Sequence, residues 1–208
     1  METLLFQGDS VTDSVRNRDN DKHLGQGYVT MVAGNLGVKY PDRFNFLNRG
    51  IGGDRSVDLL ARWKKDCLNL RPDYLSMLIG VNDVSHELAY QNGVSRNVFK
   101  NVYHILLDTA FEMNNNLKVI LMTPFIMHGE LTDCYYKPFK EELLKREMDI
   151  IEFSKEYNIP YINLRELMEK ECMPYASDSN WSIDGLHPTS AGHSIIAKKF
   201  LEKFEKIL

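Results

Sequence analysis

Three side chains in this sequence could together perform nucleophilic catalysis. Ser10 follows an apolar run in "LLFQGDSVTD", and "DGLHP" holds Asp184 and His187 three positions apart. A serine hydroxyl attacks a carbonyl well only when a base takes its proton, and an imidazole does this when a carboxylate fixes its tautomer. Gly185 and Pro188 favour a tight loop that presents the acid and the base together. The sequence therefore predicts a Ser10, His187 and Asp184 triad.

Donors for an oxyanion are the second requirement of this chemistry. Loss of one such donor raises the reaction barrier by about 2.7–4 kcal/mol. Gly53, in "NRGIGGDRS", offers a backbone N–H with no side chain in the way, and Asn82, in "GVND", offers a side-chain amide. The backbone N–H of Ser10, at the start of a turn or helix, is a third donor. We expect Ser10, Gly53 and Asn82 to form an oxyanion hole.

Each of these residues also has an ordinary structural interpretation. Ser10 alone could be a helix N-cap, and Asp184 and His187 alone could belong to a polar turn. The glycines in 50–53 could belong to a turn or to half of a dinucleotide-binding motif. That motif also needs an acidic residue at the end of the following strand, and the sequence has none there. Asn82 could bond locally in a turn. The catalytic interpretation is favoured because all the required groups occur together at the ends of predicted strands.

The elements that must position these residues alternate along the chain. Short apolar or β-branched runs predict five strands at Thr3–Gln7, Phe44–Asn48, Asp73–Gly80, Lys118–Pro124 and Ile159–Leu164. Segments with helical periodicity predict helices at 27–36, 57–70, 96–113, 137–157 and 190–206. This alternation is typical of an α/β fold in which helices cover both faces of a five-stranded parallel sheet, giving a three-layer α/β/α sandwich. Ligands of such folds bind beyond the carboxyl ends of the strands.

The size and composition of the chain limit the function classes. A chain of 208 residues suits one domain, 1–208, because domains split mainly beyond ~250 residues. Its net charge of -4, with scattered lysines and arginines, argues against a nucleic-acid partner. No run approaches the ~20 apolar residues of a membrane span, and the N-terminal apolar run is too short for a signal peptide. We expect a cytoplasmic protein with no membrane partner.

Cysteines and histidines give no sign of a metal site. Cys67, Cys134 and Cys172 lie far apart, so we expect small buried side chains rather than disulfides or zinc ligands. The histidines lack paired metal-ligand spacing, and we expect no metal and no cofactor. His193 is expected to pack or cap within the last helix. The segment 127–139, "MHGELTDCYYKPF", is polar and aromatic enough for a lid or a subunit contact.

The motifs resemble those of the SGNH or GDSL hydrolases, which are named for a serine, glycine, asparagine and histidine in four sequence blocks. "GDS" carries Ser10, "GIGGD" carries Gly53, "GVND" carries Asn82 and "DGLHP" carries His187, with Asp184 three residues before it. The resemblance implies a flavodoxin-like SGNH hydrolase fold. It also implies that Ser10 is the nucleophile, His187 the base and Asp184 its partner.

A narrower resemblance concerns the substrate. Runs such as "LGQGYV", "RPDYLSMLIGVNDV" and "ILMTPF" are similar to those of the intracellular acetylxylan esterases of this family. This implies a small-molecule acyl ester as substrate, namely an acetylated xylo-oligosaccharide, and a homo-oligomer. Trp181, Asp9 and Arg55 are the candidate substrate-binding residues; Trp181 could instead be buried, and Asp9 could support its loop. Gly52 and Asp54 depart from the serine and asparagine expected there.

Two function classes follow from the sequence. The favoured one is a metal-independent serine esterase that releases a short acyl group through an acyl-enzyme intermediate. A lysophospholipase or thioesterase is the alternative within enzymes, and it needs a groove for a longer chain. A module that binds a flavin or a phosphate at the same glycine-rich strand ends is the alternative outside enzymes.

Overall fold

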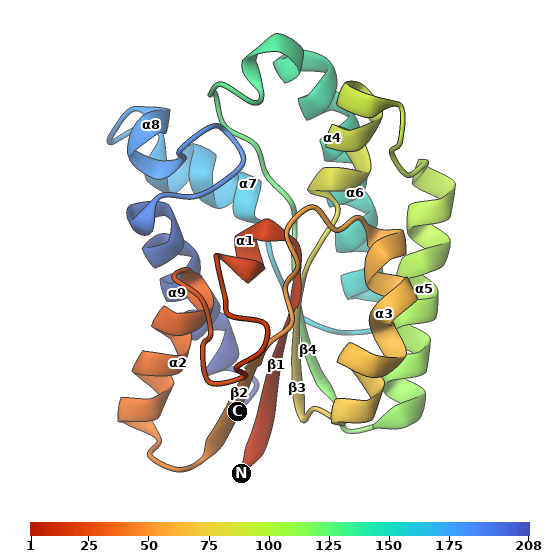
Figure 1. Ribbon diagram of the computed structural model, residues 1–208, viewed down its shortest axis with the longest axis vertical. Coiled ribbons are helices and arrows are strands. Elements are labelled where there is room, and N and C mark those ends of the chain that lie inside the picture. Colours follow the sequence, from red (N-terminus) through yellow and green to blue (C-terminus); the bar gives the residue numbers. More distant parts are fainter.

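Five parallel strands form the central sheet of the computed structural model, which describes residues 1–208 (Figure 1). The strands are paired in the order β2-β1-β3-β4-β5 and comprise β1 (Glu2–Gly8), β2 (Phe44–Asn48), β3 (Tyr74–Leu78), β4 (Lys118–Met122) and β5 (Tyr161–Ile162). This is the strand order of flavodoxin-like doubly wound sheets. The predicted five-stranded, three-layer fold is confirmed.

Helices lie on both faces of this sheet. They are α1 (Ser10–Asp13), α2 (Tyr28–Lys39), α3 (Ser56–Asp66), α4 (Val81–Tyr90), α5 (Arg96–Met113), α6 (Tyr136–Glu156), α7 (Leu164–Leu167), α8 (Asp178–Trp181) and α9 (Ser190–Phe204), with short helical turns η1 (Leu68–Leu70), η2 (Asp133–Tyr135) and η3 (Met168–Cys172). In Figure 1, α2 and α9 stand on one side of the sheet and α3 and α5 on the other. None of the helices combines the length and the apolar character that a bilayer crossing requires.

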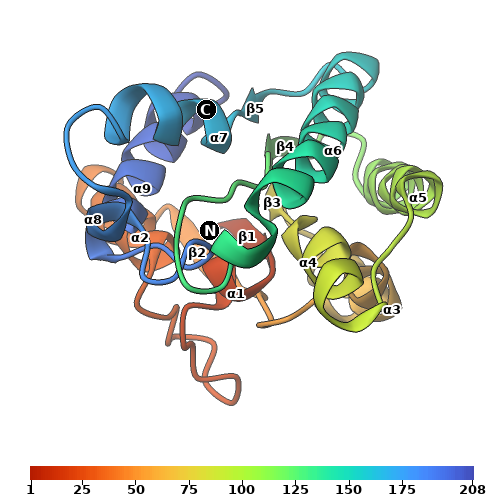
Figure 2. The ribbon, with the colours of Figure 1, turned by 90° about the horizontal axis from the view of Figure 1, so that it is seen from above.

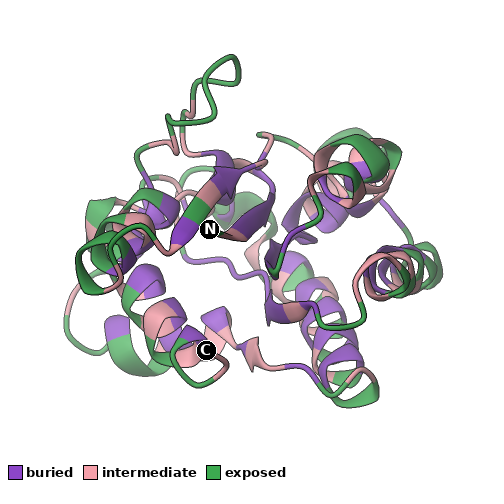
Figure 3. Cartoon of the chain, turned by 90° about the horizontal axis from the view of Figure 1, so that it is seen from below, coloured by how far each residue is buried: buried purple, intermediate pink, exposed green.

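Two apolar cores result from the alternation of side chains along the strands. Leu4 and Phe6 of β1 pack in the core under α2 and α9, whereas Leu5 between them packs in the core under α3 and α5. Tyr28 and Trp63 are fully or almost fully buried on opposite faces of the sheet. Figure 3 shows this arrangement from below, with buried strands in the centre and exposed residues on the outer helix faces.

The bounds of the observed helices match the predicted bounds in some places and differ from them in others. Helix α5 spans the predicted residues, and α6 and α9 differ from prediction by one or two residues at an end. Helix α4 is not among the predicted helices, although Val81, Val84 and Leu88 follow helical spacing. Strand β5, at the sheet edge, is only two residues long and pairs with β4 alone.

The three cysteine thiols are free. Cys67 and Cys172 are buried, as expected, and burial raises the pKa of each thiol. Cys134 is exposed in η2, so the expectation of burial is wrong for this residue.

Candidate active site

Loops at the carboxyl edge of the sheet bring Ser10 and His187 together, although they lie 177 positions apart in the chain. Strand β1 ends at Gly8, and the chain turns at once into the short helix α1, whose first residue is Ser10. A Cβ atom at Gly8 would lie 2.4 Å from the carbonyl oxygen of Leu78, so the sharp turn needs glycine. The hydroxyl Oγ of Ser10 is 2.9 Å from Nε2 of His187.

Asp184 completes this arrangement from the same loop as His187. Its Oδ2 is 2.6 Å from Nδ1 of His187, and its Oδ1 accepts the backbone N–H groups of Leu186 and His187. Because a carboxylate can only accept, we assign the proton to Nδ1, which leaves Nε2 free to accept from Ser10. Gly185 adopts a φ of 97°, which favours glycine and lets the loop fold this tightly.

The environment of Asp184 keeps its carboxylate charged. Partial burial favours the neutral acid, but the hydrogen bonds from the His187 ring and from two backbone N–H groups favour the anion, and together they lower the pKa of Asp184. An ionised Asp184 can stabilise a proton on the imidazole. The geometry therefore suits transfer of the Ser10 proton to His187.

The three predicted oxyanion donors each have a free N–H bond. The backbone N–H groups of Ser10 and Gly53 donate to no protein acceptor. The side-chain amide of Asn82 donates to the carbonyl oxygen of Asp54 at 3.0 Å, which places it against the loop that contains Gly53 and leaves one of its two N–H bonds free. Gly53 has a φ of 85°, again in the region that favours glycine. The role of these donors as an oxyanion hole stays a prediction.

A network of buried polar groups holds the β2–α3 loop against α1. Oδ2 of Asp13 accepts the backbone N–H of Gly52 at 2.9 Å, and Arg18 donates to the same oxygen. Asn48, at the end of β2, donates to the carbonyl oxygen of Thr12 at 2.6 Å. Sequence analysis assigned no role to Asp13 and Asn48, although they are the last residue of "LLFQGDSVTD" and the first of "NRGIGGDRS".

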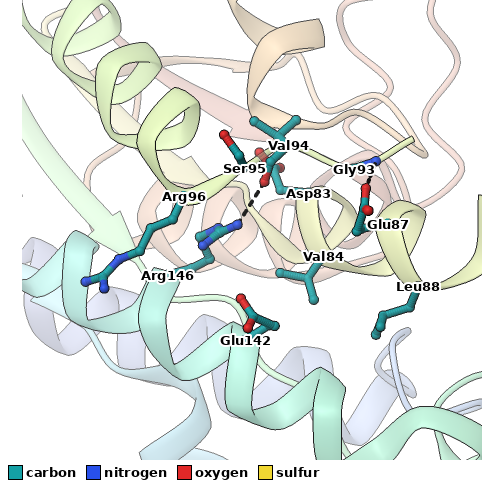
Figure 4. A pocket seen from close by; sticks show the side chains of 10 residues that line it. All are labelled: Asp83, Val84, Glu87, Leu88, Gly93, Val94, Ser95, Arg96, Glu142 and Arg146. Atoms are coloured by element: carbon teal, nitrogen blue, oxygen red, sulfur yellow. Dashed lines mark hydrogen bonds between the residues drawn. The ribbon is translucent and has the colours of Figure 1, made fainter. Parts of the chain in front are cut away.

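Hydrogen bonds of Asp83, the residue after Asn82, connect helices α3 and α4. Asp83 accepts hydrogen bonds from the backbone N–H and the hydroxyl of Ser56, the first residue of α3. Burial raises the pKa of Asp83. Figure 4 shows its side chain in a second cavity, of about 500 Å³, where Arg146 donates to the carbonyl oxygen of Val94 at 2.8 Å. No member of the triad lines this cavity.

The cavity that contains the triad has a volume of about 440 Å³. Its lining includes Val15, Ile183 and His193, which sequence analysis did not assign to the site. Val15 and Ile183 are 76% and 73% exposed, so two aliphatic side chains flank the opening. Only their place in the sequence could have indicated them, because Val15 comes just after "LLFQGDSVTD" and Ile183 directly before "DGLHP". Figure 2 shows α1 and the loops around this site from above.

The structure does not place the three candidate substrate-binding residues in this cavity. Asp9 is buried, where Oδ1 caps α1 by accepting the N–H of Val11, and burial raises the pKa of Asp9 to about 7. Arg55 binds Asp58 at the start of α3. Trp181 packs against the core, with its indole N–H buried. Capping, ion pairing and packing engage these three side chains, and their role in substrate binding stays a prediction.

The segment 127–139 supports the Asp184 loop, and none of its residues lines the triad cavity. The backbone N–H groups of Met127 and Leu131 donate to the carbonyl oxygens of Gly185 and Asp184. A Cβ atom at Gly129 would lie 2.3 Å from the carbonyl carbon of Asp184, so the two backbones touch. The segment thus positions the acid of the triad.

Comparison with known proteins identifies the family. A family model described as the GDSL-like lipase/acylhydrolase family matches residues 6–195. The chain belongs to this family. A curated acetylxylan esterase of Geobacillus stearothermophilus is 32% identical over 210 residues, covering 97% of this chain and 93% of that protein. Membership of the GDSL family and this relative support an esterase.

Solved structures agree with this assignment. The crystal structure of Axe2, an acetylxylan esterase from Geobacillus stearothermophilus, superposes with a TM-score of 0.85 at 30% identity, covering 97% of this chain and 93% of that chain. An α/β hydrolase from the metagenome of Lake Arreo in Spain superposes with a TM-score of 0.86 at 24% identity, covering 100% and 96% of the two chains, which shows the shared fold.

Variants of Axe2 described as catalytic mutants replace a serine, an aspartate or a histidine by alanine. Their aspartate and histidine are three positions apart, the spacing of Asp184 and His187 here. Another Axe2 variant replaces the tryptophan directly before that aspartate by isoleucine. The present chain has Ile183 directly before Asp184, and Trp181 lies two positions earlier.

Proposed function

We propose that this protein is a serine esterase that releases acetate from acetylated sugars such as xylo-oligosaccharides. The observation that carries the proposal is the continuous contact from Asp184 through His187 to Ser10, with 2.6 Å and 2.9 Å between the bonded atoms. The names of its relatives, an acetylxylan esterase and an acetyl-xylooligosaccharide esterase, support the choice of substrate.

The first half of the reaction forms an acyl-enzyme. Oγ of Ser10 attacks the ester carbonyl carbon while its proton passes to Nε2 of His187, and Asp184 stabilises the imidazolium. Negative charge gathers on the carbonyl oxygen, where the N–H groups of Ser10, Gly53 and Asn82 receive it. The bond to the sugar oxygen then breaks, and His187 returns its proton to that oxygen as the alcohol leaves.

The second half releases the acyl group. A water molecule gives a proton to Nε2 of His187 as its oxygen attacks the acyl carbon. The bond to Oγ of Ser10 breaks, the proton returns to Oγ, and acetic acid departs. Only the residues of this chain and water take part in the sequence of steps.

The first prediction concerns acetate release from acetylated xylo-oligosaccharides. The wild-type protein should release acetate, and Ser10→Ala should lower kcat by at least about 10³-fold while the thermal unfolding temperature stays close to that of wild type, because one hydroxyl is removed. A long-chain ester is the control substrate. Full activity in Ser10→Ala would refute the role of Ser10, and faster hydrolysis of the long-chain ester would favour a lysophospholipase or thioesterase.

A further inference from the structure

The imidazole of His193 is fixed in one tautomer next to the triad. His193 lies in the first turn of α9, where its side chain lines the triad cavity and the residue is 6% exposed. Its Nδ1 is 3.1 Å from the backbone nitrogen of Tyr28 and accepts the hydrogen bond. Since a backbone N–H can only donate, Nδ1 carries no proton, and the proton of the neutral ring must be on Nε2.

The ring stays neutral and cannot easily move. Burial, and to a smaller extent the positive charge that His187 can carry, lower the pKa of His193 to about 4. Asp13 and Asp184 are the other ionisable groups that line the cavity. The ring stacks on Tyr28 at 6.4 Å between centroids. A Cβ atom at Gly27 would lie 2.7 Å from Cε1 of His193, so the backbone of Gly27 packs closely against the ring. The direction of the Nε2–H bond is therefore set before any ligand binds.

Nε2 of His193 is a donor without an acceptor. No hydrogen bond engages this atom, and it is not among the four unpartnered side-chain atoms that are sealed from solvent, which belong to Ser76, Arg146 and Trp181. Nε2 therefore keeps contact with solvent, and the cavity that His193 lines is the one that contains the triad. The triad residues bond one another, and the carboxylate of Asp13 accepts from Gly52 and Arg18, so these groups are already engaged.

We propose that His193 is a specificity-determining residue whose Nε2–H donates a hydrogen bond to an oxygen of the alcohol part of the substrate, beside the ester. This inference rests on the proposed esterase function and deepens it. The aliphatic side chains of Val15 and Ile183 flank the same cavity, so they contribute apolar contact but no selection for hydroxyl groups. A polyhydroxylated alcohol such as a sugar offers the acceptor that the N–H lacks. An aryl or alkyl alcohol without a neighbouring oxygen does not.

The test compares two variants on two substrates. In His193→Asn, the amide oxygen can replace Nδ1 toward Tyr28, but no donor reaches the position of Nε2; in His193→Gln, the longer side chain carries an amide N–H to about that position. The substrates are a monoacetylated methyl xyloside and p-nitrophenyl acetate. We expect His193→Asn to lower kcat/KM for the sugar ester about 10-fold more than for p-nitrophenyl acetate, mainly through KM, and His193→Gln to restore part of the ratio.

A substrate analogue provides a second arm of the test. The acetylated xyloside that lacks the hydroxyl next to the ester should react about 10-fold more slowly than its parent with the wild-type protein, and the two should react alike with His193→Asn. Equal losses on all substrates would overturn the proposal and indicate a packing role. Absence of activity on p-nitrophenyl acetate in the wild type would refute the esterase function itself, which is a separate outcome.

Discussion

At the scale of single residues, some polar side chains close to Ser10 in the sequence are buried and support the fold. Asp9 stands next to Ser10 in the motif, yet its carboxylate is 1% exposed and caps α1. His193 was expected to serve its own helix, yet it lines the triad cavity. The sequence specifies which residues flank the nucleophile. The direction in which each side chain points depends on packing that no local motif encodes.

The burial of Asp9 makes a prediction about stability and pH. Burial raises the pKa of Asp9 from 3.8 to about 7, so the folded state keeps a proton that the unfolded state loses between these values, and Asp9 weakens folding as the pH rises through that window. Asp9→Asn removes the charge and can still cap α1. The free energy of unfolding of Asp9→Asn should exceed that of wild type by an amount that grows between pH 4 and pH 7, to roughly 4 kcal/mol at most. This difference should stay constant above pH 7.

Denaturant unfolding of the wild type and of Asp9→Asn at pH 4.5 and pH 8 measures this gain. Asp42→Asn is a suitable control, because Asp42 is exposed in the turn before β2 and should show little difference between the two pH values. If the difference in free energy of unfolding between Asp9→Asn and wild type does not change with pH, the prediction is wrong.

At the scale of elements, the site depends on close contact between the turn after β1 and the turn after β2. A Cβ atom at Gly50 would lie 2.3 Å from the backbone nitrogen of Asp13, and Asp13 in turn holds the N–H of Gly52. The β2 turn and α1 must therefore separate if Gly50 gains a side chain. Helix α2 offers a contrast, because Gly34 in its interior has open space around it.

A pair of glycine substitutions tests this contact. Gly50→Ala should lower the free energy of unfolding by about 1–3 kcal/mol and reduce kcat, because the loop that carries Gly53 moves away from Ser10. Gly34→Ala should raise the free energy of unfolding by about 0.5–1 kcal/mol with unchanged kcat, because alanine favours a helix. Chemical denaturation and ester hydrolysis measure both effects. Wild-type activity in Gly50→Ala would show that the contact does not position the site.

At the scale of the whole molecule, topology explains how much of the site was predictable. In a parallel sheet, all strands end at one edge, so motifs that follow β1, β2 and β3 must meet there, and the order β2-β1-β3 places their turns side by side. Ser10, Gly53 and Asn82 could be predicted on this ground. Helix α4 was missed because polar residues near its start, such as Asn82 and Asp83, resemble a turn, although its apolar residues follow helical spacing. The supporting role of 127–139 depends on contacts with Asp184 that are distant in sequence.

The central claim is that residues from both ends of the chain form one catalytic centre at Ser10. The most direct measurement is the intact mass and the labelled peptide of the protein after reaction with a fluorophosphonate. We expect one adduct per chain, on Ser10, with parallel loss of esterase activity, and labelling slowed by at least about 10³-fold in His187→Ala. An adduct on another residue, or equally fast labelling of Ser10 without His187, would contradict the account.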